Sequence, residues 1–162
     1  DVDRLYASLG EELRFLGYYM EIQRFRMGER VQYVQTVPEE LLETEVPRLI
    51  LQPLVENAIN HGIDPKVEGG YVRLEALCDH DRLLLRVTDN GVGMSEAQLL
   101  SLRASLLSDS DSGRHLALKN IHRRLKLLFG EESELTIESI EGRGSIVTVR
   151  MPLSKKGDGE NV

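Results

Sequence analysis

Apolar residues recur every three or four positions in several stretches of the chain, which is the pattern of helices with one buried face. The first stretch runs from Val2 to Met27, and Gly28 supplies a stop signal directly after it. The second starts at Pro47, which suits the first turn of a helix, and continues to about Gly62. The pattern therefore predicts two long helices in the first part of the chain.

Two more helices are predicted in the second half. Ser95 is placed to cap one of them, and Gln98 completes a capping box three positions later. The other covers about residues 116–129 and ends at Gly130. Between these helices, the small polar residues 108–114 predict a flexible loop.

Strands are predicted where apolar and polar residues alternate or where β-branched residues gather. The segments with this pattern are residues 31–37, 71–78, 82–89, 134–139 and 145–151. Short turns join the second segment to the third and the fourth to the fifth, so each of these pairs is expected to form a hairpin. Hairpins together with amphipathic helices predict an α+β fold, a two-layer sandwich with helices on one face of a mixed, mostly antiparallel sheet.

Composition limits the classes of function. The chain has 162 residues, enough for one domain with a sizeable core. Its net charge of -7 and pI near 5.2 argue against a protein that neutralises nucleic-acid phosphates or binds anionic membranes. No stretch of the sequence is apolar over the length of a membrane span. The single cysteine, Cys78, falls in an alternating segment, which predicts a buried thiol.

The second predicted helix carries polar residues beside its apolar stripe. Asn57, Asn60 and His61 gather on one face at spacings of three and four. Asparagine is a mediocre helix former, so two of them beside a core stripe need a reason. One reason is capping near the helix end; the other is contact with a ligand, because an amide offers an oxygen to a hard cation and donors to phosphate.

The second polar feature follows the strand at residues 82–89. Asp89 continues the alternation of its apolar face, so its carboxylate is expected to point inward, where it needs a hydrogen-bond donor. Gly91 and Gly93 then allow a tight turn close to something flat. A plain Asp-Asn-Gly turn is the alternative explanation for this segment.

Together these motifs resemble the ATP-binding domain of sensor histidine kinases, within the superfamily shared with gyrase, the Hsp90 chaperones and MutL. The resemblance covers about residues 9–152. Residues 54–62 (LVENAINHG) look like the N box, residues 89–94 (DNGVGM) like the first glycine box, and residues 142–145 (GRGS) with Pro152 like the closing box. The segments YMEIQRFR and LQPLVEN are particularly similar to the LytS/YesM branch.

The resemblance implies a role for each position. Asn57 would coordinate magnesium through its side-chain oxygen, and Asp89 would accept from the adenine amino group with help from Ser145 and a water. Gly91 and Gly93 would form a wall under the base. The residues that the resemblance places at ATP are Asn57, Asn60, His61, Asp89, Gly91, Gly93, Met94, Gly113, Arg114, His115 and Ser145.

The sequence departs from the family in two places. ATP-hydrolysing members carry a glutamate one turn before the magnesium asparagine; here that position is Pro53, which favours transfer to a histidine over hydrolysis. In the second glycine box, His115 and Ala117 stand where the family usually has glycine. In the family, this segment forms a lid that closes over the phosphates. Either the lid of this chain binds phosphate more weakly, or Arg114 and His115 compensate with charge-assisted contacts.

The resemblance also implies partners and organisation. Magnesium-ATP would donate its terminal phosphoryl to a histidine on an absent upstream segment, which would also form a homodimer, and a response regulator receiver domain would then receive the group. No catalytic residue is expected within this chain: His80 and His122 are expected to be solvent-exposed, and the family's acceptor motif is absent. No nucleic acid and no direct membrane contact are expected.

We expect residues 1–28 to lead from the dimerisation region, residues 29–153 to bind ATP, and residues 154–162 to be a disordered tail. The expected location is the cytoplasmic side of a membrane-anchored parent protein. Two alternatives stay open. One is an anti-sigma-factor-type serine kinase of the same superfamily, and the other is a nucleotide-binding regulatory module without turnover.

Overall fold

The computed structural model describes residues 5–110 and 113–154. Its main sheet has the strand order β2-β4-β5-β7-β6. The strands of this sheet are β2 (Val31–Thr36), β4 (Gly70–Asp79), β5 (Arg82–Asp89), β6 (Glu134–Ile140) and β7 (Gly144–Pro152). The α-helices are α1 (Leu9–Met27), α2 (Leu51–Ala58), α3 (Glu96–Leu106) and α4 (Leu116–Phe129). Short β1 (Tyr6–Ser8) and β3 (Glu45–Pro47) form a separate two-stranded sheet.

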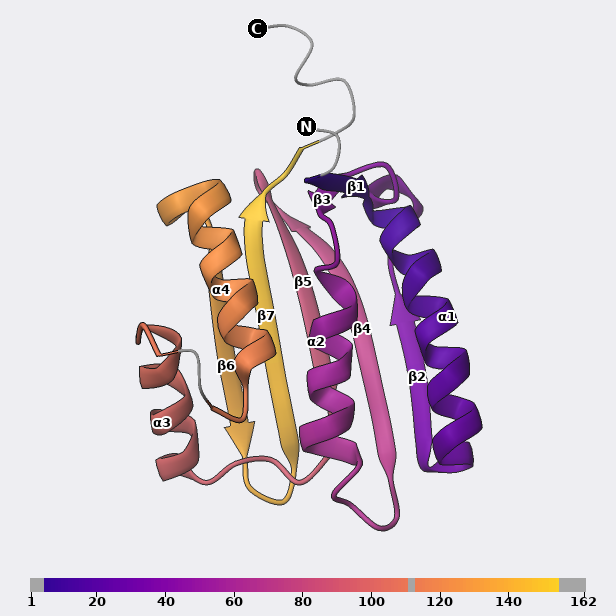
Figure 1. Cartoon of the computed structure of the whole chain (residues 1–162). Coiled ribbons are helices and arrows are strands. Elements are labelled where there is room, and N and C mark those ends of the chain that lie inside the picture. The colour runs from indigo at the N-terminus through magenta and orange to yellow at the C-terminus, as the bar shows by residue number, and fades with distance from the viewer. Residues whose placement is uncertain (1–4, 111–112, 155–162) are drawn as a thin grey trace, which may run out of the picture.

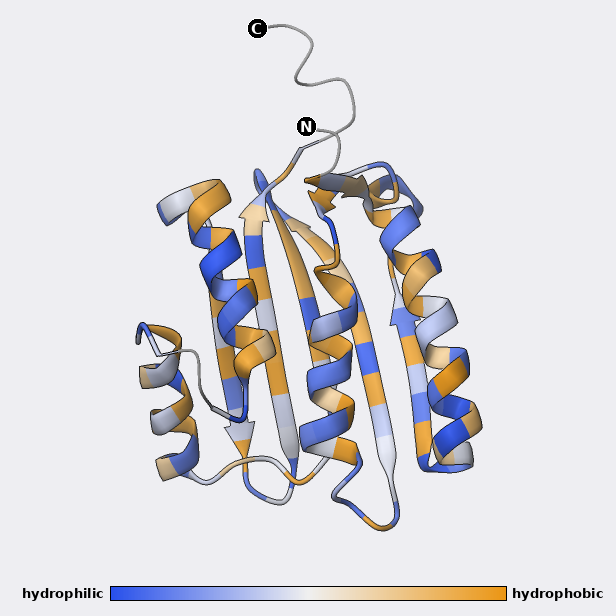
Figure 2. Ribbon diagram, in the orientation of Figure 1, coloured by the Kyte–Doolittle hydropathy of each residue, from blue (hydrophilic) through white to orange (hydrophobic). Residues whose placement is uncertain are grey.

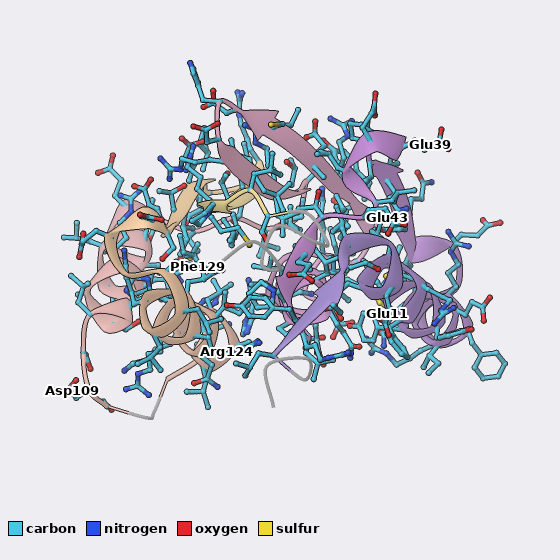
Figure 3. All side chains as sticks on the ribbon, turned by 90° about the horizontal axis from the view of Figure 1, so that it is seen from above. Glu11, Glu39, Glu43, Asp109, Arg124 and Phe129 are labelled. Atoms are coloured by element: carbon cyan, nitrogen blue, oxygen red, sulfur yellow. The ribbon has the colours of Figure 1, made fainter. Side chains whose placement is uncertain are left out.

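The predicted fold class is confirmed. β2 pairs with β4 in parallel, whereas every other neighbour in the main sheet is antiparallel, so the sheet is mixed and mostly antiparallel. The helices lie on one face of it (Figure 1). At the upper end in that view, Arg124 of α4 donates to the carbonyl of Arg48, which follows β3. The ring of Phe129 lies 6.4 Å from that of Tyr6 in β1. Figure 3 labels Arg124 and Phe129 on α4.

The core lies between the helices and the covered face of the sheet. Hydrophobic and hydrophilic residues alternate along the strands (Figure 2), as the period of two requires. In β5 the buried side chains Leu83, Leu85 and Val87 lead to Asp89, which is buried as well. The predicted stripe of α2 is also buried in this core; it consists of Ile50, Leu51, Leu54, Val55 and Ala58. These two elements carry the two polar features to the same edge of the core.

Two predicted helix boundaries are wrong. α1 begins at Leu9, because Ser8 caps it through a bond from the Glu11 amide (3.1 Å), and the preceding strand β1 pairs with β3. Pro47 belongs to β3 and lies opposite Tyr6, so it is not in a helical turn, and α2 begins only at Leu51. Both errors have one cause: a strand pairing between distant segments overrides the local helical pattern. Residues 1–4 of the predicted first helix lie outside the described residues.

The other boundaries largely follow the sequence pattern. Ser95 and Gln98 form the predicted capping box of α3, and α4 ends at Gly130, whose φ is 58°. The short helical turns that had not been predicted are η2 (Gly28–Arg30), η3 (Glu39–Leu41) and η5 (Gly130–Glu132). The end of the second predicted helix, expected at about Gly62, is the π-type turn η4 (Ile59–Ile63). The expected loop at 108–114 and tail at 154–162 fall partly on residues 111–112 and 155–162, which lie outside the described ranges.

Two burial predictions are wrong. Cys78 is exposed: it lies next to the end of β4, and its thiol donates to the carbonyl of His80 in the following turn (3.3 Å). His122 is half-buried rather than solvent-exposed, and its Nδ1 atom is buried without a hydrogen-bond partner. His80 is exposed as expected, in the turn between β4 and β5. Among residues 5–110 and 113–154, none of the helices has both the length and the apolar character needed to cross a membrane.

Candidate functional site

A small cavity opens where the end of α2, the end of β5 and the start of β7 meet, at the lower edge of the sheet in Figure 1. Its volume is about 20 Å³. Its polar lining is formed by Asn57, His61, Asp89, His115 and Ser145. Apolar walls come from Met94, Leu102, Leu118, Ile137 and Val147, and Gly62 and Gly93 complete it. Residues of α2, η4, β5, α3, α4, β6 and β7 therefore contribute to one pocket.

Asp89 lines this pocket and is 6% exposed. Its Oδ1 atom accepts a hydrogen bond from the backbone amide of Gly91 at 2.8 Å. Burial raises the pKa of Asp89 to about 6, although the backbone amides of Gly91 and Ser145 and the charge of Lys66 oppose that rise. The carboxylate is thus an acceptor that the fold holds in place and only partly satisfies.

Glycines let the backbone close tightly around Asp89. A Cβ atom at Gly62 would lie 2.6 Å from the Oδ1 atom of Asp89, so any side chain there would displace the carboxylate. A Cβ at Gly91 would overlap the backbone of Gly62, to which the Val92 amide also donates (3.0 Å). Gly93 has φ of 65°, a conformation that side chains disfavour. The glycine positions singled out in the sequence are therefore required by contact and by backbone angle.

A serine network beside Asp89 was not predicted. Ser139 on β6 accepts from the Met94 amide (2.8 Å) and donates to the Gly144 carbonyl (3.1 Å). The hydroxyl of Ser145 lies 2.8 Å from that of Ser139, and because the Ser139 proton is already used, Ser145 is the donor between them. Only the register that places Ser139 opposite Ser145 reveals this network, and no local sequence signal gives it.

Asn57 lines the same pocket, where α2 passes into η4. Its Oδ1 atom is 3.1 Å from Nδ1 of His115, so the imidazole Nδ1–H donates to the amide oxygen. The ring of His115 also lies against that of His61, with centroids 4.3 Å apart. These three side chains join the end of α2 to the residue that precedes α4.

Both histidines at this end are held neutral. Burial, and then the neighbouring His61 and Arg114, lower the pKa of His115 to about 4. Burial and the charge of Arg114 also lower the pKa of His61, opposed by a backbone hydrogen bond with Arg114. His115 therefore carries no charge near pH 7 in this conformation, and its bond to Asn57 is between neutral groups.

A second cavity of about 630 Å³ lies outside the first, between α3 and the residues that lead into α4. Gly113 and Arg114 line it, while His61, Gly93, Met94, Leu102 and His115 line both cavities. Gly113 has φ of 132°, so its glycine is conformationally needed. His115 has φ of -113°, which any residue adopts, so the substituted glycine position is not strained.

The buried side chain of Lys119 in α4 contacts the residues that follow α3. Its Nζ atom donates to the Ser108 hydroxyl (3.3 Å) and to the Ser110 carbonyl. Lys119 thus ties the segment after α3 to α4, and it was not predicted as part of the site. Lys66, which donates to the Asn90 carbonyl at 2.9 Å, was also missed; both lysines are recognisable only once the surrounding loops are in place.

Most of the predicted site residues come together. Seven line the inner cavity: Asn57, His61, Asp89, Gly93, Met94, His115 and Ser145. Gly91 lies directly behind Asp89, and Gly113 and Arg114 line the outer cavity. Asn60 is exposed and lines neither of the two cavities.

Residues 43–155 match the family described as histidine kinase-, DNA gyrase B- and HSP90-like ATPase. The chain belongs to this ATPase family. Sensor protein kinase HptS of Staphylococcus aureus (strain USA300) is 33% identical to it over 149 residues. That alignment covers 92% of this chain but 28% of the relative, so the chain spans little more than a quarter of the curated relatives it matches.

Solved structures show the same fold. The catalytic domain of histidine kinase ThkA, at 16% identity, superposes with a TM-score of 0.67 over 93% of this chain and 97% of that one. Full-length ShkA in complex with AMPPNP, at 19% identity, gives 0.66 over 93% of this chain and 31% of that one. The two-layer architecture is thus that of histidine kinase catalytic domains.

The donor set of this ATPase-family domain fits magnesium only if a substrate shares the coordination. No cluster of three or more His, Cys, Asp or Glu residues suited to a metal occurs in the described part of the chain. Asn57 offers one hard oxygen, which its bond from His115 shows to point into the pocket. Magnesium keeps several waters and readily shares phosphate oxygens, so a single protein oxygen is compatible with it.

Proposed function

We propose that this chain is the ATP-binding catalytic domain of a sensor histidine kinase. The observation that carries the proposal is that the buried carboxylate of Asp89 and the amide of Asn57, from β5 and α2, line one pocket. A buried acceptor at one end suits an amino group on a base, and an amide oxygen at the other suits a cation bound to phosphates. Family membership and the similarity to sensor protein kinase HptS support the same assignment.

In this proposal Asp89 accepts from the adenine amino group, and Ser145 contributes through a water. The apolar side chains of Leu102, Leu118 and Ile137 cover the faces of the base. Asn57 would hold magnesium, which would neutralise charge on the phosphates. His61 and Arg114 lie on the phosphate side, where Arg114 at the outer cavity supplies positive charge.

The reaction transfers the terminal phosphoryl of ATP to a histidine nitrogen on a segment outside this chain, leaving ADP. An aspartate of a response regulator then receives the phosphoryl group. Phosphoryl transfer depends mainly on positioning and charge neutralisation, so no acid or base within the pocket is required. Pro53, one turn before Asn57, carries no group that activates water, which favours transfer over hydrolysis. The parent would be a dimeric, membrane-anchored sensor with this domain in the cytoplasm.

Calorimetric titration and phosphoryl labelling test the proposal together. The chain alone is expected to bind magnesium-ATP and to acquire no label on His61, His80, His115 or His122. Adding the upstream segment of the parent protein should produce acid-labile phosphate on that segment. A chain that binds neither ATP nor ADP at millimolar concentration contradicts the proposal.

A regulatory nucleotide-binding module is the second candidate. It is favoured by the small volume of the inner cavity and by His115 beside Asn57, since both features oppose rapid exchange of nucleotide. Binding without any labelling of the added upstream segment would select this alternative.

A further inference from the structure

The inner cavity is too small for the ligand that its lining suits. A volume of about 20 Å³ is close to what one water needs, and a purine ring is many times larger. The polar ends of the pocket are nevertheless formed, since Asp89 and Asn57 both have oriented oxygens. The conformation seen here is therefore closed, and some of the lining must move before a nucleotide enters.

The residues that line both the inner and the outer cavity are candidates for this movement. They are His61, Gly93, Met94, Leu102 and His115. Among them, His115 makes a hydrogen bond with Asn57, another residue of the inner lining, which lies 58 positions away in the sequence. It also contacts the ring of His61, so two side chains of the α2 end hold it.

We propose that His115 is a latch that keeps the site closed by occupying the oxygen of Asn57 that magnesium-ATP needs. A positively polarised Nδ1–H and a magnesium ion repel each other at one amide oxygen, so they compete for it. Nucleotide entry thus requires the His115–Asn57 bond to break and the start of α4 to move away. The inference rests on the proposed nucleotide site and adds a regulatory contact to it.

The latch depends on the side chain rather than on the backbone at position 115. A φ of -113° and ψ of 43° are accessible to alanine, so His115→Ala removes the imidazole without forcing a new backbone conformation. The α4 helix retains the Lys119 amide bond to the position-115 carbonyl (3.2 Å). The variant therefore separates the latch from the integrity of the helix.

Calorimetry with magnesium-ATP and magnesium-ADP measures the competition. Loss of one neutral hydrogen bond from the closed state should tighten both nucleotides about five- to tenfold in His115→Ala. His80→Ala, which removes an exposed histidine from the β4–β5 turn, should leave both affinities unchanged. Weaker binding in His115→Ala would identify His115 as a nucleotide ligand and overturn the latch. Unchanged binding would also overturn the latch.

Hydrogen exchange in the absence of nucleotide supplies an independent measurement. Amides of residues 116–119 should exchange at least about threefold faster in His115→Ala than in wild type. Asn57→Ala should accelerate the exchange of these amides by the same factor. The double variant should show no further increase, because both substitutions remove one interaction. Additive effects or unchanged exchange would overturn the latch even where nucleotide binds. If no variant binds nucleotide while the exchange pattern holds, the proposed function fails and the His115–Asn57 contact stands.

Discussion

The two ends of the pocket are built differently. At the Asp89 end, hydrogen bonds run mostly to backbone groups: Gly91 donates to Asp89, and Ser139 joins the Met94 amide to the Gly144 carbonyl. At the Asn57 end, the contacts join the side chains of Asn57, His61 and His115. Backbone groups are fixed by the sheet, whereas side chains change rotamer at small cost. The Asp89 end is therefore preorganised, whereas the proposed latch requires the Asn57 end to exchange its partners when a ligand binds.

The preorganised end also carries the larger cost in stability. A buried carboxylate with a raised pKa is less stable in its charged form than the same group in the unfolded chain. Substitutions at the two ends should therefore differ in kind: those at Asp89 alter both binding and stability, and those at Asn57 alter mainly the binding of phosphates.

The largest effect is expected from Asp89→Asn. The new amide presents donors to the adenine amino group, so ATP, ADP and adenosine should all bind about 100-fold more weakly or worse. Calorimetry with the three ligands measures this. Asp79→Asn, an exposed carboxylate near the β4–β5 turn, is the matched control and should bind normally. Loss confined to ATP would place Asp89 at the phosphates instead of at the base.

The pH dependence of stability tests the same end without a ligand. The pKa of Asp89 is raised from 3.8 to about 6 in the folded chain, so this group favours folding below pH 4 and loses that contribution as pH rises to about 6. Near pH 7 the penalty is roughly 2 to 3 kcal/mol. Asp89→Asn should therefore be more stable than wild type at pH 7 and should lose this advantage near pH 4.

Denaturant unfolding of wild type and Asp89→Asn at pH 4, 5, 6 and 7 gives the difference in free energy directly. Asp79→Asn again serves as control, with no comparable gain at pH 7. A stability difference between wild type and Asp89→Asn that is constant across this range would contradict the assignment of the titrating group.

At the exchangeable end, Asn57→Ala should weaken magnesium-ATP about tenfold or more, because one metal ligand is lost. Adenosine has no phosphates, so its affinity should stay the same or tighten slightly as the His115 contact disappears. Titrations with and without magnesium distinguish the loss of the metal ligand from the loss of the His115 contact. Gln32→Ala, which removes an exposed amide on β2, should change neither affinity. An equal loss of affinity for ATP and for adenosine would contradict the assignment of Asn57 as a magnesium ligand.

The smallest effect is expected within the serine network. Ser139→Ala removes a group that bonds to Met94, Gly144 and Ser145, so unfolding should become easier by about 1 to 2 kcal/mol. Nucleotide affinity should fall only about threefold, since Ser139 itself is not among the residues that line the inner cavity. Ser145→Ala loses a single bond of the network and should cost less stability. Thermal unfolding of both variants decides the order.

Local patterns predicted those parts of the site that belong to one element. The period of two along β5 placed Asp89 on the buried face, and the helical period placed Asn57 beside the apolar stripe of α2. The capping box of α3 was likewise readable, because its two residues are three positions apart. Asn60 shows the limit of this reasoning: the period places it near Asn57, but the chain turns into η4 and leaves it exposed.

The sequence by itself determined the fold class, the family resemblance and the direction in which Asp89 points, because each depends on residues close together in the chain. Only the tertiary structure decided that Pro47 pairs with Tyr6, that Ser139 lies opposite Ser145, and that His115 occupies the oxygen of Asn57. These contacts join segments that are far apart in sequence. Periodicity gives a side chain's direction relative to its own element, whereas its partner depends on how the elements pack.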